Sequence, residues 1–255
     1  MKAVFDGLFA GRVAVVTGAG QGNGEAIARG LAASGARVVL SDVNAAGAET
    51  VAADIAEQGG QATAINFDVT DRAAAEAAAD EVRDRIGPVD VLVNNAGILE
   101  RKPVDDADLL DSAERHWRVN AQGTLIVTRA FLAQLRETRG CVVNLASICS
   151  FISYAKVTGY AASKGAVAQL TRALAVELAA DGIRVNALAP GVISTPMTKE
   201  TREDPQRLGA FLAQTPMGRI GEAEELVGPV LFLASPMSSY VTGAILPVDG
   251  GFLCR

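Results

Sequence analysis

Two residues one helical turn apart carry the first candidate chemistry. Tyr160 and Lys164 stand four positions apart in the stretch Tyr-Ala-Ala-Ser-Lys, so on a helix their side chains share one face. Tyrosine serves as an acid–base catalyst at neutral pH only if its pKa falls from about 10 to near 7, which needs roughly 4 kcal/mol. An ammonium group about 4 Å away supplies roughly 1 kcal/mol in water but about 4 kcal/mol at an effective dielectric constant near 20. The pair therefore predicts proton transfer only in a partly dry cleft, and without further motifs an ordinary helix surface explains it better.

A glycine-rich segment after the first apolar run is typical of a phosphate site. Residues 17–24 read Thr-Gly-Ala-Gly-Gln-Gly-Asn-Gly and lead into a helical pattern. Glycines allow a tight turn whose N–H groups face an anion, and the positive end of the helix dipole points to the same place. The spacing is G-x-x-x-G-x-G rather than G-x-G-x-x-G, because Asn23 and Glu25 occupy the places of the third glycine. The turn predicts an anionic cofactor, with a purely structural turn as the alternative.

An acidic residue after the second apolar run narrows the choice of cofactor. Asp42 lies 18 residues beyond Gly24, close to the spacing at which a carboxylate binds the adenosine ribose of a dinucleotide. A carboxylate accepts hydrogen bonds from both ribose hydroxyls but repels a 2′-phosphate, and neither Val43 nor Asn44 supplies a cation. The sequence thus predicts NAD, with NADP disfavoured. The alternative is that Asp42 only caps the next helix, a role that Ser41 or Asn44 fits as well.

These candidates need a framework that brings strand ends together. Short β-branched runs alternate with long Ala-rich stretches of helical period, the pattern of βα units that feed a parallel sheet. The sequence predicts an α/β fold: a single Rossmann-like doubly wound domain over residues 1–255, with a seven-stranded parallel sheet flanked by helices on both faces. The predicted strands are 12–17, 37–41, 62–66, 89–94, 141–146, 183–188 and 244–248. The predicted helices are 24–33, 45–58, 72–86, 112–137, 160–180 and 222–234.

One late segment breaks this alternation. Between Pro190 and Gly221, three further prolines and a cluster of charges interrupt the pattern over a length too great for a simple connector. We interpret residues around 195–220 as a lid over a substrate site, and a surface excursion without function is the alternative.

The composition of the 255-residue chain excludes several classes of protein. A net charge of −6 leaves no basic stripe for nucleic acid, and the apolar runs are too short to cross a membrane. No secretion signal develops in residues 1–11, so we expect a soluble, cytoplasmic protein. The three cysteines form no C-x-x-C pair, which argues against a disulfide framework or a zinc site. With His116 as the only histidine, Ser-His-Asp hydrolysis would need that residue as its base.

Taken together, the motifs resemble those of the short-chain dehydrogenase/reductase family, over essentially the whole chain. Residues 17–24 resemble its T-G-x-x-x-G-x-G, residues 94–97 its N-N-A-G and residues 160–164 its Y-x-x-x-K. Further matches are Ser147 at the family's catalytic serine position, Asn120 at its helix asparagine, residues 190–195 at its nicotinamide carboxamide loop and residues 68–69 beside the adenine.

The resemblance implies a role for each catalytic candidate. Tyr160 is the acid–base, Ser147 holds the substrate oxygen, Lys164 binds the nicotinamide ribose and lowers the tyrosine pKa, and Asn120 supports a water relay. The implied cofactor-binding set is Gly18, Gln21, Gly22, Asn23, Gly24, Asp42, Val43, Asp68, Val69, Asn94, Ala96, Gly97, Tyr160, Lys164, Pro190, Gly191, Ile193 and Thr195. The expected substrate pocket comprises Ser147, Cys149, Tyr154, Val192 and Met197, and no metal is expected.

Three residues need separate comment. Asn23 departs from the family, which usually has an apolar residue there, so it either contacts cofactor or substrate or only caps the helix. Tyr154 has Thr158 instead of a lysine four residues later, so we assign it to the pocket. The resemblance gives His116 no chemical role.

The predicted function is an NAD-dependent oxidoreductase that transfers a hydride between NAD and a secondary alcohol, with polyols or sugar-like alcohols preferred. The preference for polyols rests on the predicted use of NAD, which suits oxidation, and on a looser similarity of residues 215–251 to polyol dehydrogenases. One alternative is a 3-oxoacyl thioester (acyl-carrier-protein) reductase, against which Asp42 counts because such enzymes generally use NADPH. Another is a noncatalytic NAD-sensing scaffold, against which the intact catalytic set counts. The expected partners are a small-molecule alcohol or ketone and, as is common in the family, three further copies in a homotetramer.

Overall fold

The computed structural model of this chain describes residues 7–254, and its centre is a parallel sheet. The seven strands lie in the order β3-β2-β1-β4-β5-β6-β7. Their bounds are β1 (Val13–Thr17), β2 (Arg37–Ser41), β3 (Gln61–Ala64), β4 (Val91–Asn94), β5 (Cys141–Leu145), β6 (Arg184–Pro190) and β7 (Ile245–Val248). The predicted fold class is confirmed, and all seven strands form within a few residues of the predicted bounds.

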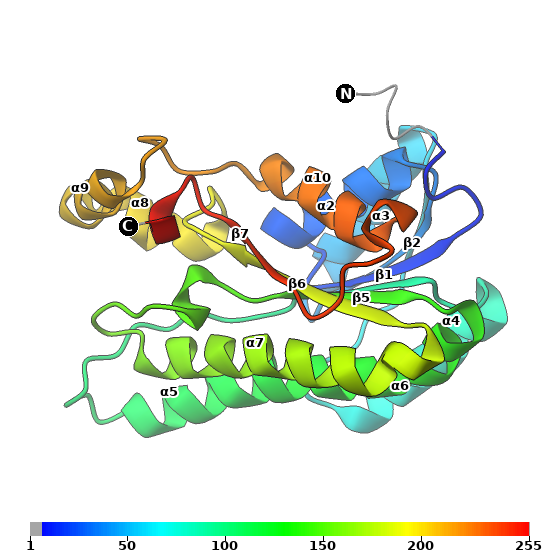
Figure 1. The fold of residues 1–255 in the computed structure, drawn as a ribbon, viewed down its shortest axis with the longest axis horizontal. Coiled ribbons are helices and arrows are strands. Elements are labelled where there is room, and N and C mark those ends of the chain that lie inside the picture. The colour runs from blue at the N-terminus through cyan, green and yellow to red at the C-terminus, as the bar shows by residue number, and fades with distance from the viewer. Residues whose placement is uncertain (1–6, 255) are drawn as a thin grey trace.

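Helices cover both faces of the sheet. Figure 1 shows α2, α3 and α10 on one face and α4, α5, α6 and α7 on the other. Their bounds are α2 (Gly22–Ala33), α3 (Ala45–Glu57), α4 (Arg72–Arg85), α5 (Leu109–His116), α6 (Gly123–Thr138), α7 (Thr158–Leu178) and α10 (Val227–Ala234). The doubly wound arrangement puts the carboxyl ends of the strands at one edge, where ligands bind in such folds.

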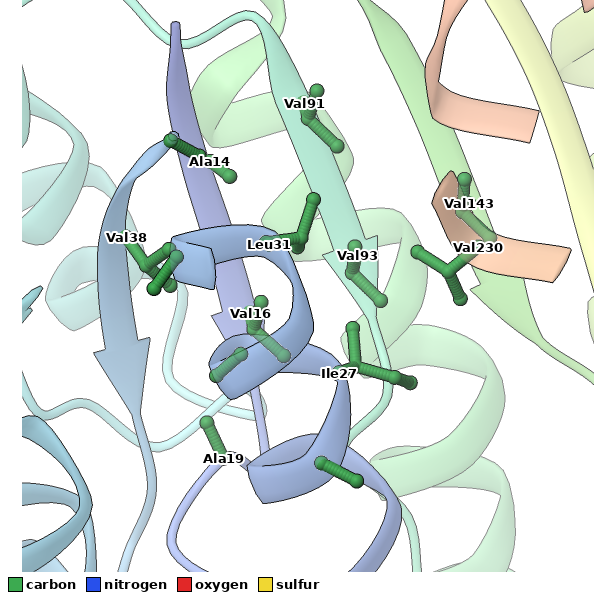
Figure 2. Packing of buried hydrophobic residues seen from close by; sticks show 14 of the residues in the cluster. Ala14, Val16, Ala19, Ile27, Leu31, Val38, Val91, Val93, Val143 and Val230 are labelled. Carbon is green, nitrogen blue, oxygen red and sulfur yellow. The ribbon is translucent and has the colours of Figure 1, made fainter. Parts of the chain in front are cut away.

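The core explains why the strands are apolar throughout. Ala14 and Val16 of β1 belong to the cluster under α2 and α10, which includes Ile27 and Val230 (Figure 2). Val13 and Val15 of the same strand belong to the opposite cluster, under α4 and α6. Because side chains alternate between faces, a strand that is covered on both sides needs an apolar residue at every position.

The long helix predicted over residues 112–137 is interrupted. The helical path begins at Leu109, and a π-helical turn over Trp117–Gln122 separates α5 from α6. Asn120 lies in this turn, and its Oδ1 accepts a hydrogen bond from the backbone N–H of Ile98 at 2.8 Å. A π turn inserts one residue without changing the apolar pattern much, so periodicity alone predicts one continuous helix.

The segment expected to be an irregular lid contains two short helices, α8 (Lys199–Glu203) and α9 (Pro205–Gln214). The carboxylate of Asp204 accepts hydrogen bonds from the N–H groups of Gln206 and Arg207, and Pro205 occupies the first helical position. A proline there favours a helix start instead of breaking the helix. The base of the segment is held by the backbone hydrogen bond from Gly221 to Val192 at 3.0 Å.

Candidate active site

A cleft of about 540 Å³ opens at the carboxyl ends of the strands. Loops that follow β1, β2, β4, β5 and β6 line it, together with the start of α7 and the beginning of the segment that carries α8. The strand order reverses at β1 and β4, so the loops after these two strands diverge and leave space between them.

The glycine-rich turn after β1 forms one wall of the cleft. Gly18 and Gly22 have φ angles of +62° and +58°, which side chains rarely adopt. A Cβ atom on Gly24 would lie 2.1 Å from the carbonyl oxygen of Gly18, so only glycine fits there. The amide of Asn95 donates hydrogen bonds to the carbonyl oxygens of Thr17 and Gly18, at 2.9 and 2.8 Å. The turn is thus rigidly held, with the N-terminus of α2 facing the cleft.

Asp42 lies at the same wall and braces the turn. Its Oδ2 accepts a hydrogen bond from the backbone N–H of Gly20 at 2.9 Å, and its Oδ1 accepts one from Asn44 at 2.9 Å. The N-cap of α3 is Asn44, whose side chain accepts from the N–H of Gly47. Helix capping therefore does not account for Asp42, which also lines the cleft.

Ser147, Tyr160 and Lys164 meet across the cleft from the glycine turn. The Lys164 Nζ donates to the carbonyl oxygen of Leu145 at 2.6 Å and lies 5.9 Å from the centroid of the Tyr160 ring. The Ser147 hydroxyl accepts a hydrogen bond from the N–H of Cys149 at 3.1 Å, which fixes the serine at the start of a 3₁₀ turn. The structure thus brings three of the four predicted catalytic side chains together, Asn120 being the fourth.

Burial shifts the two titratable groups of this trio in opposite directions. It raises the pKa of Tyr160 to about 12, and it lowers the pKa of Lys164 to about 8. A hydrogen bond with Ser147 and the nearby charge of Arg101 act in the other direction on the Tyr160 pKa. The sequence resemblance implies that Lys164 lowers the Tyr160 pKa. In the structure, the Lys164 ammonium donates a hydrogen bond to the carbonyl oxygen of Leu145.

Three predicted site residues lie behind the cleft wall rather than on it: Gly24, Asn94 and Asn120. Besides accepting from Ile98, Asn120 donates to the Ile98 carbonyl at 3.1 Å and to Ser163 Oγ at 2.9 Å, which fixes the loop after β4 against α7. Asn94 donates to Thr128 Oγ1 at 3.0 Å and to Asn144 Oδ1 at 2.9 Å, in a buried network between β4, β5 and α6.

The other predicted residues line the cleft. They are Gly18, Gln21, Gly22, Asn23, Asp42, Val43, Asp68, Val69, Ala96, Gly97, Ser147, Cys149, Tyr154, Tyr160, Lys164, Pro190, Gly191, Val192, Ile193, Thr195 and Met197. The Oδ1 of Asn23 is buried and has no hydrogen-bond partner among the described residues. From the sequence, Asn23 either contacts a ligand or caps the helix. The N-cap of α2 is Gln21, so Asn23 does not cap this helix.

A cluster of aromatic rings packs behind Tyr154, which lines the cleft. Tyr154 packs edge-on against Phe252 at 6.0 Å, and Phe252 stacks on Phe211 at 4.7 Å between centroids. These rings join the loop after β5, helix α9 and the C-terminal turn, which lie together in Figure 1. The Tyr154 hydroxyl is buried without a partner, and burial raises its pKa above the usual value.

Asn95, Arg101 and Thr201 also line the cleft, although the predicted set of site residues contains none of them. Nothing in the sequence pattern of residues 98–103 distinguishes Arg101 from its charged neighbours. Thr201 comes from α8, in the segment expected to be irregular. The Arg101 Nη2 donates to Thr201 Oγ1 at 2.7 Å, across 100 residues of chain.

Residues 7–254, which the structure describes, contain neither a metal-ion cluster nor a membrane-spanning helix. No group of three or more His, Cys, Asp or Glu side chains is arranged there to hold a metal ion. None of the helices in that range is long and apolar enough to span a bilayer.

Comparison with known proteins gives matches over nearly the full length. A family model described as enoyl-(acyl carrier protein) reductase matches residues 18–253. Galactitol 2-dehydrogenase (L-tagatose-forming) of Cereibacter sphaeroides is 47% identical over 249 residues, or 95% of each chain. The 5-keto-D-gluconate 5-reductase of Escherichia coli (strain K12) is 39% identical over 249 residues, or 96% of each chain. A gluconate 5-dehydrogenase from Burkholderia cenocepacia J2315, solved with NADP and tartrate, superposes with a TM-score of 0.94 at 38% identity, covering 98% of this chain and 99% of that one.

Proposed function

Because this chain belongs to the short-chain dehydrogenase/reductase family and is an NAD(P)-dependent oxidoreductase of CH–OH groups, we propose that it uses NAD to oxidise a polyol or sugar-like secondary alcohol reversibly. The observation that carries the proposal is the convergence of Ser147, Tyr160 and Lys164 opposite a glycine turn braced by Asp42. Relatives that act on galactitol and on 5-keto-D-gluconate support the polyhydroxylated substrate class.

The residues of the glycine turn fit a dinucleotide. The close approach of Gly24 to Gly18 leaves room only for backbone, and the α2 N-terminus presents N–H groups suited to a pyrophosphate. Asn23 also lines the cleft, and its buried Oδ1 has no partner among the described residues. When bound, the nicotinamide ring accepts or gives up the hydride. We assign Lys164 to the nicotinamide ribose and residues 190–195 to the carboxamide.

Asp42 is the basis for proposing NAD over NADP. Its carboxylate lines the cleft beside Val43 and Asp68, and among the described lining residues the cationic side chains are Arg101 and Lys164, both near Tyr160. A 2′-phosphate beside Asp42 would meet a negative charge and find no cation there. A gluconate 5-dehydrogenase relative was solved with NADP, so the cofactor choice needs a direct test.

Tyr160 is the acid–base of the proposed reaction. In the oxidation, the Tyr160 oxygen takes the proton of the substrate hydroxyl, and in the reduction it returns that proton to the carbonyl oxygen. The Ser147 hydroxyl donates a hydrogen bond to the same substrate oxygen and fixes its position. Asn120 holds the loop after β4 and supports a water relay that connects Lys164 with solvent.

A substrate and cofactor screen tests the proposal. Purified enzyme is assayed with NAD and with NADP against hexitols, pentitols, aldonates and simple secondary alcohols, and in reverse with keto sugars and a 3-oxoacyl thioester. We expect turnover of polyhydroxylated substrates with NAD at least 10 times more efficient than with NADP. Preferred turnover of the thioester with NADPH would replace this proposal with the reductase alternative.

We also propose a single catalytic domain in which residues 195–220 act as the substrate lid, with four copies assembling in the cytoplasm. The placement of Met197 and Thr201 at the cleft supports the lid. Exposed apolar side chains on the helical layer, such as Leu110 and Trp117, support the assembly.

A further inference from the structure

One cationic side chain in the cleft has no place in the chemistry described above. Arg101 is half-buried, lines the cleft and donates to the hydroxyl of Thr201. Within residues 7–254 no carboxylate forms an ion pair with its guanidinium. A guanidinium is permanently charged and has five N–H donors, so one neutral hydroxyl leaves most of its hydrogen-bonding capacity unused.

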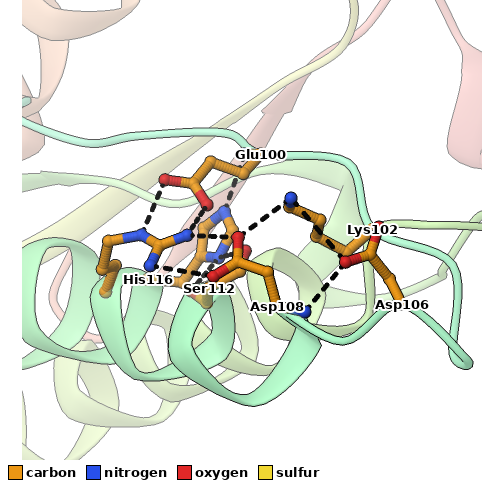
Figure 3. A network of polar contacts seen from close by, with 7 residues as sticks. Glu100, Lys102, Asp106, Asp108, Ser112 and His116 are labelled. Carbon is orange, nitrogen blue, oxygen red and sulfur yellow. Dashed lines mark hydrogen bonds and ion pairs between the residues drawn. The ribbon is translucent and has the colours of Figure 1, made fainter.

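The neighbouring charges of the loop are neutralised elsewhere. Glu100 is bound by Arg115 of α5. Lys102 forms an ion pair with Asp108, directly before α5 (Figure 3). The backbone N–H of Glu100 also donates to the Nε2 of His116 at 2.9 Å. The residues on either side of Arg101 are thus held against α5, while Arg101 itself lines the cleft.

This anchoring holds the guanidinium ready for a ligand. The loop does not have to be ordered when a ligand binds, because His116, Arg115 and Asp108 already hold it. Thr201 is buried on α8, so the pair joins the loop after β4 to the proposed lid. A ligand that bridges the two residues would bind both walls of the substrate end.

The guanidinium lies near the reacting groups. Burial raises the pKa of the Tyr160 hydroxyl and of the Cys149 thiol, and the charge of Arg101 acts against that rise at both groups; all three residues line the same cleft. The adenosine half of a dinucleotide is expected at Asp42, on the wall formed by the glycine turn. A group bound to Arg101 is therefore part of the substrate molecule.

We propose that Arg101 and Thr201 bind a carboxylate of the substrate, so that the preferred substrate is a polyhydroxy acid or its keto acid rather than a neutral polyol. One guanidinium and one hydroxyl match a singly charged carboxylate, whereas a dianionic phosphate usually meets more than one cation. The inference rests on the proposed function, since it specifies which member of the polyhydroxylated class that site takes.

The test compares acidic and neutral substrates of equal length. The kcat/KM values for a six-carbon aldonate and the corresponding hexitol are measured with NAD for the wild type, Arg101→Gln, Arg101→Lys and the control Arg72→Gln. Arg72 is exposed on α4, outside the cleft, and its surface ion pair with Glu76 contributes little. We expect the ratio of acid to neutral efficiency to fall about 100-fold in Arg101→Gln, to recover partly in Arg101→Lys and to stay unchanged in Arg72→Gln.

Two further readouts separate specificity from folding. The midpoint of thermal unfolding and the NADH dissociation constant should be the same in Arg101→Gln as in the wild type. An equal loss with the acid and the neutral substrate, or a wild type that prefers the hexitol or a sugar phosphate, would overturn the inference while leaving the proposed function intact. If the wild type turned over no polyhydroxylated substrate at all, the proposed function itself would fail.

Discussion

Removing the charge of Asp42 tests the cofactor assignment without removing the support of the glycine turn. In Asp42→Asn the amide oxygen can still accept from the N–H of Gly20, a hydrogen bond of 2.9 Å in this structure. In Asp42→Ala that support is lost as well. The pair of variants therefore separates the effect of charge on cofactor choice from the effect of bracing on the turn.

The expected magnitude follows from the acceptor sites that remain on the carboxylate. Of about four lone-pair directions, Gly20 and Asn44 use two, which leaves about two for ribose hydroxyls. Replacing a charged acceptor by a neutral one costs about 1 kcal/mol per bond, or about 2 kcal/mol for NAD. Relieving a repulsion at about 5 Å and an effective dielectric constant near 20 helps NADP by about 3 kcal/mol per unit charge.

Together these terms shift the NAD to NADP ratio by about 5 kcal/mol, or more than about 10³-fold in kcat/KM. The ratio is measured by steady-state oxidation of the best polyhydroxylated substrate with each cofactor. Asp42→Ala should show a similar change in ratio and an additional loss, of up to about 10-fold, with both cofactors. A ratio that stays at the wild-type value in Asp42→Asn would mean that Asp42 only braces the turn.

Four other outcomes are expected. Tyr160→Phe should lower kcat by about 10³-fold with the NADH dissociation constant within about 3-fold of wild type, as stopped assays and fluorescence titration would measure, and near-normal turnover would refute the acid–base role. The oxidation kcat/KM should rise with pH and the reduction should fall, because burial raises the Tyr160 pKa to about 12 and oxidation needs the phenolate; opposite slopes would contradict this. Asn94→Leu should cost about 1–3 kcal/mol of unfolding free energy in urea titrations, since it leaves the buried Oδ1 of Asn144 without a donor and removes one of the hydrogen bonds of Thr128. Gly24→Ala should abolish dinucleotide binding while circular dichroism shows the helices and sheet retained, because its Cβ would lie 2.1 Å from a backbone oxygen of the turn.

The elements were predictable because their signals are local. Each strand is a short β-branched run, and the glycine turn lies directly between β1 and α2, so residues 17–24 give both the fold and the site. The spacing of Tyr160 and Lys164 likewise requires only a helix. Where a prediction depended on neighbours in sequence, the structure follows it closely.

The remaining features depend on contacts between distant segments. Neither the π turn at Asn120, which is held by Ile98 from another loop, nor the contact between Arg101 and Thr201 has a signal in the local pattern. The helices α8 and α9 were missed because Pro205 was taken as a breaker, whereas Asp204 caps a helix that begins at this proline. Asn94 belongs to the same motif as residues that line the cleft, but it is buried behind them. A motif can therefore place a residue near a site without showing whether that residue contacts the ligand.

The electrostatics of the cleft connect the catalytic proposal with the substrate inference. Burial favours the neutral forms of both Tyr160 and Lys164, since it raises the pKa of the first to about 12 and lowers that of the second to about 8. Lys164 is therefore a weaker source of positive charge than its type suggests as the pH approaches 8. The positive charge of Arg101 acts against this rise in the Tyr160 pKa. An anionic substrate that pairs with Arg101 would remove part of that effect and so favour the protonated phenol, the form that gives its proton to the carbonyl oxygen of a keto acid.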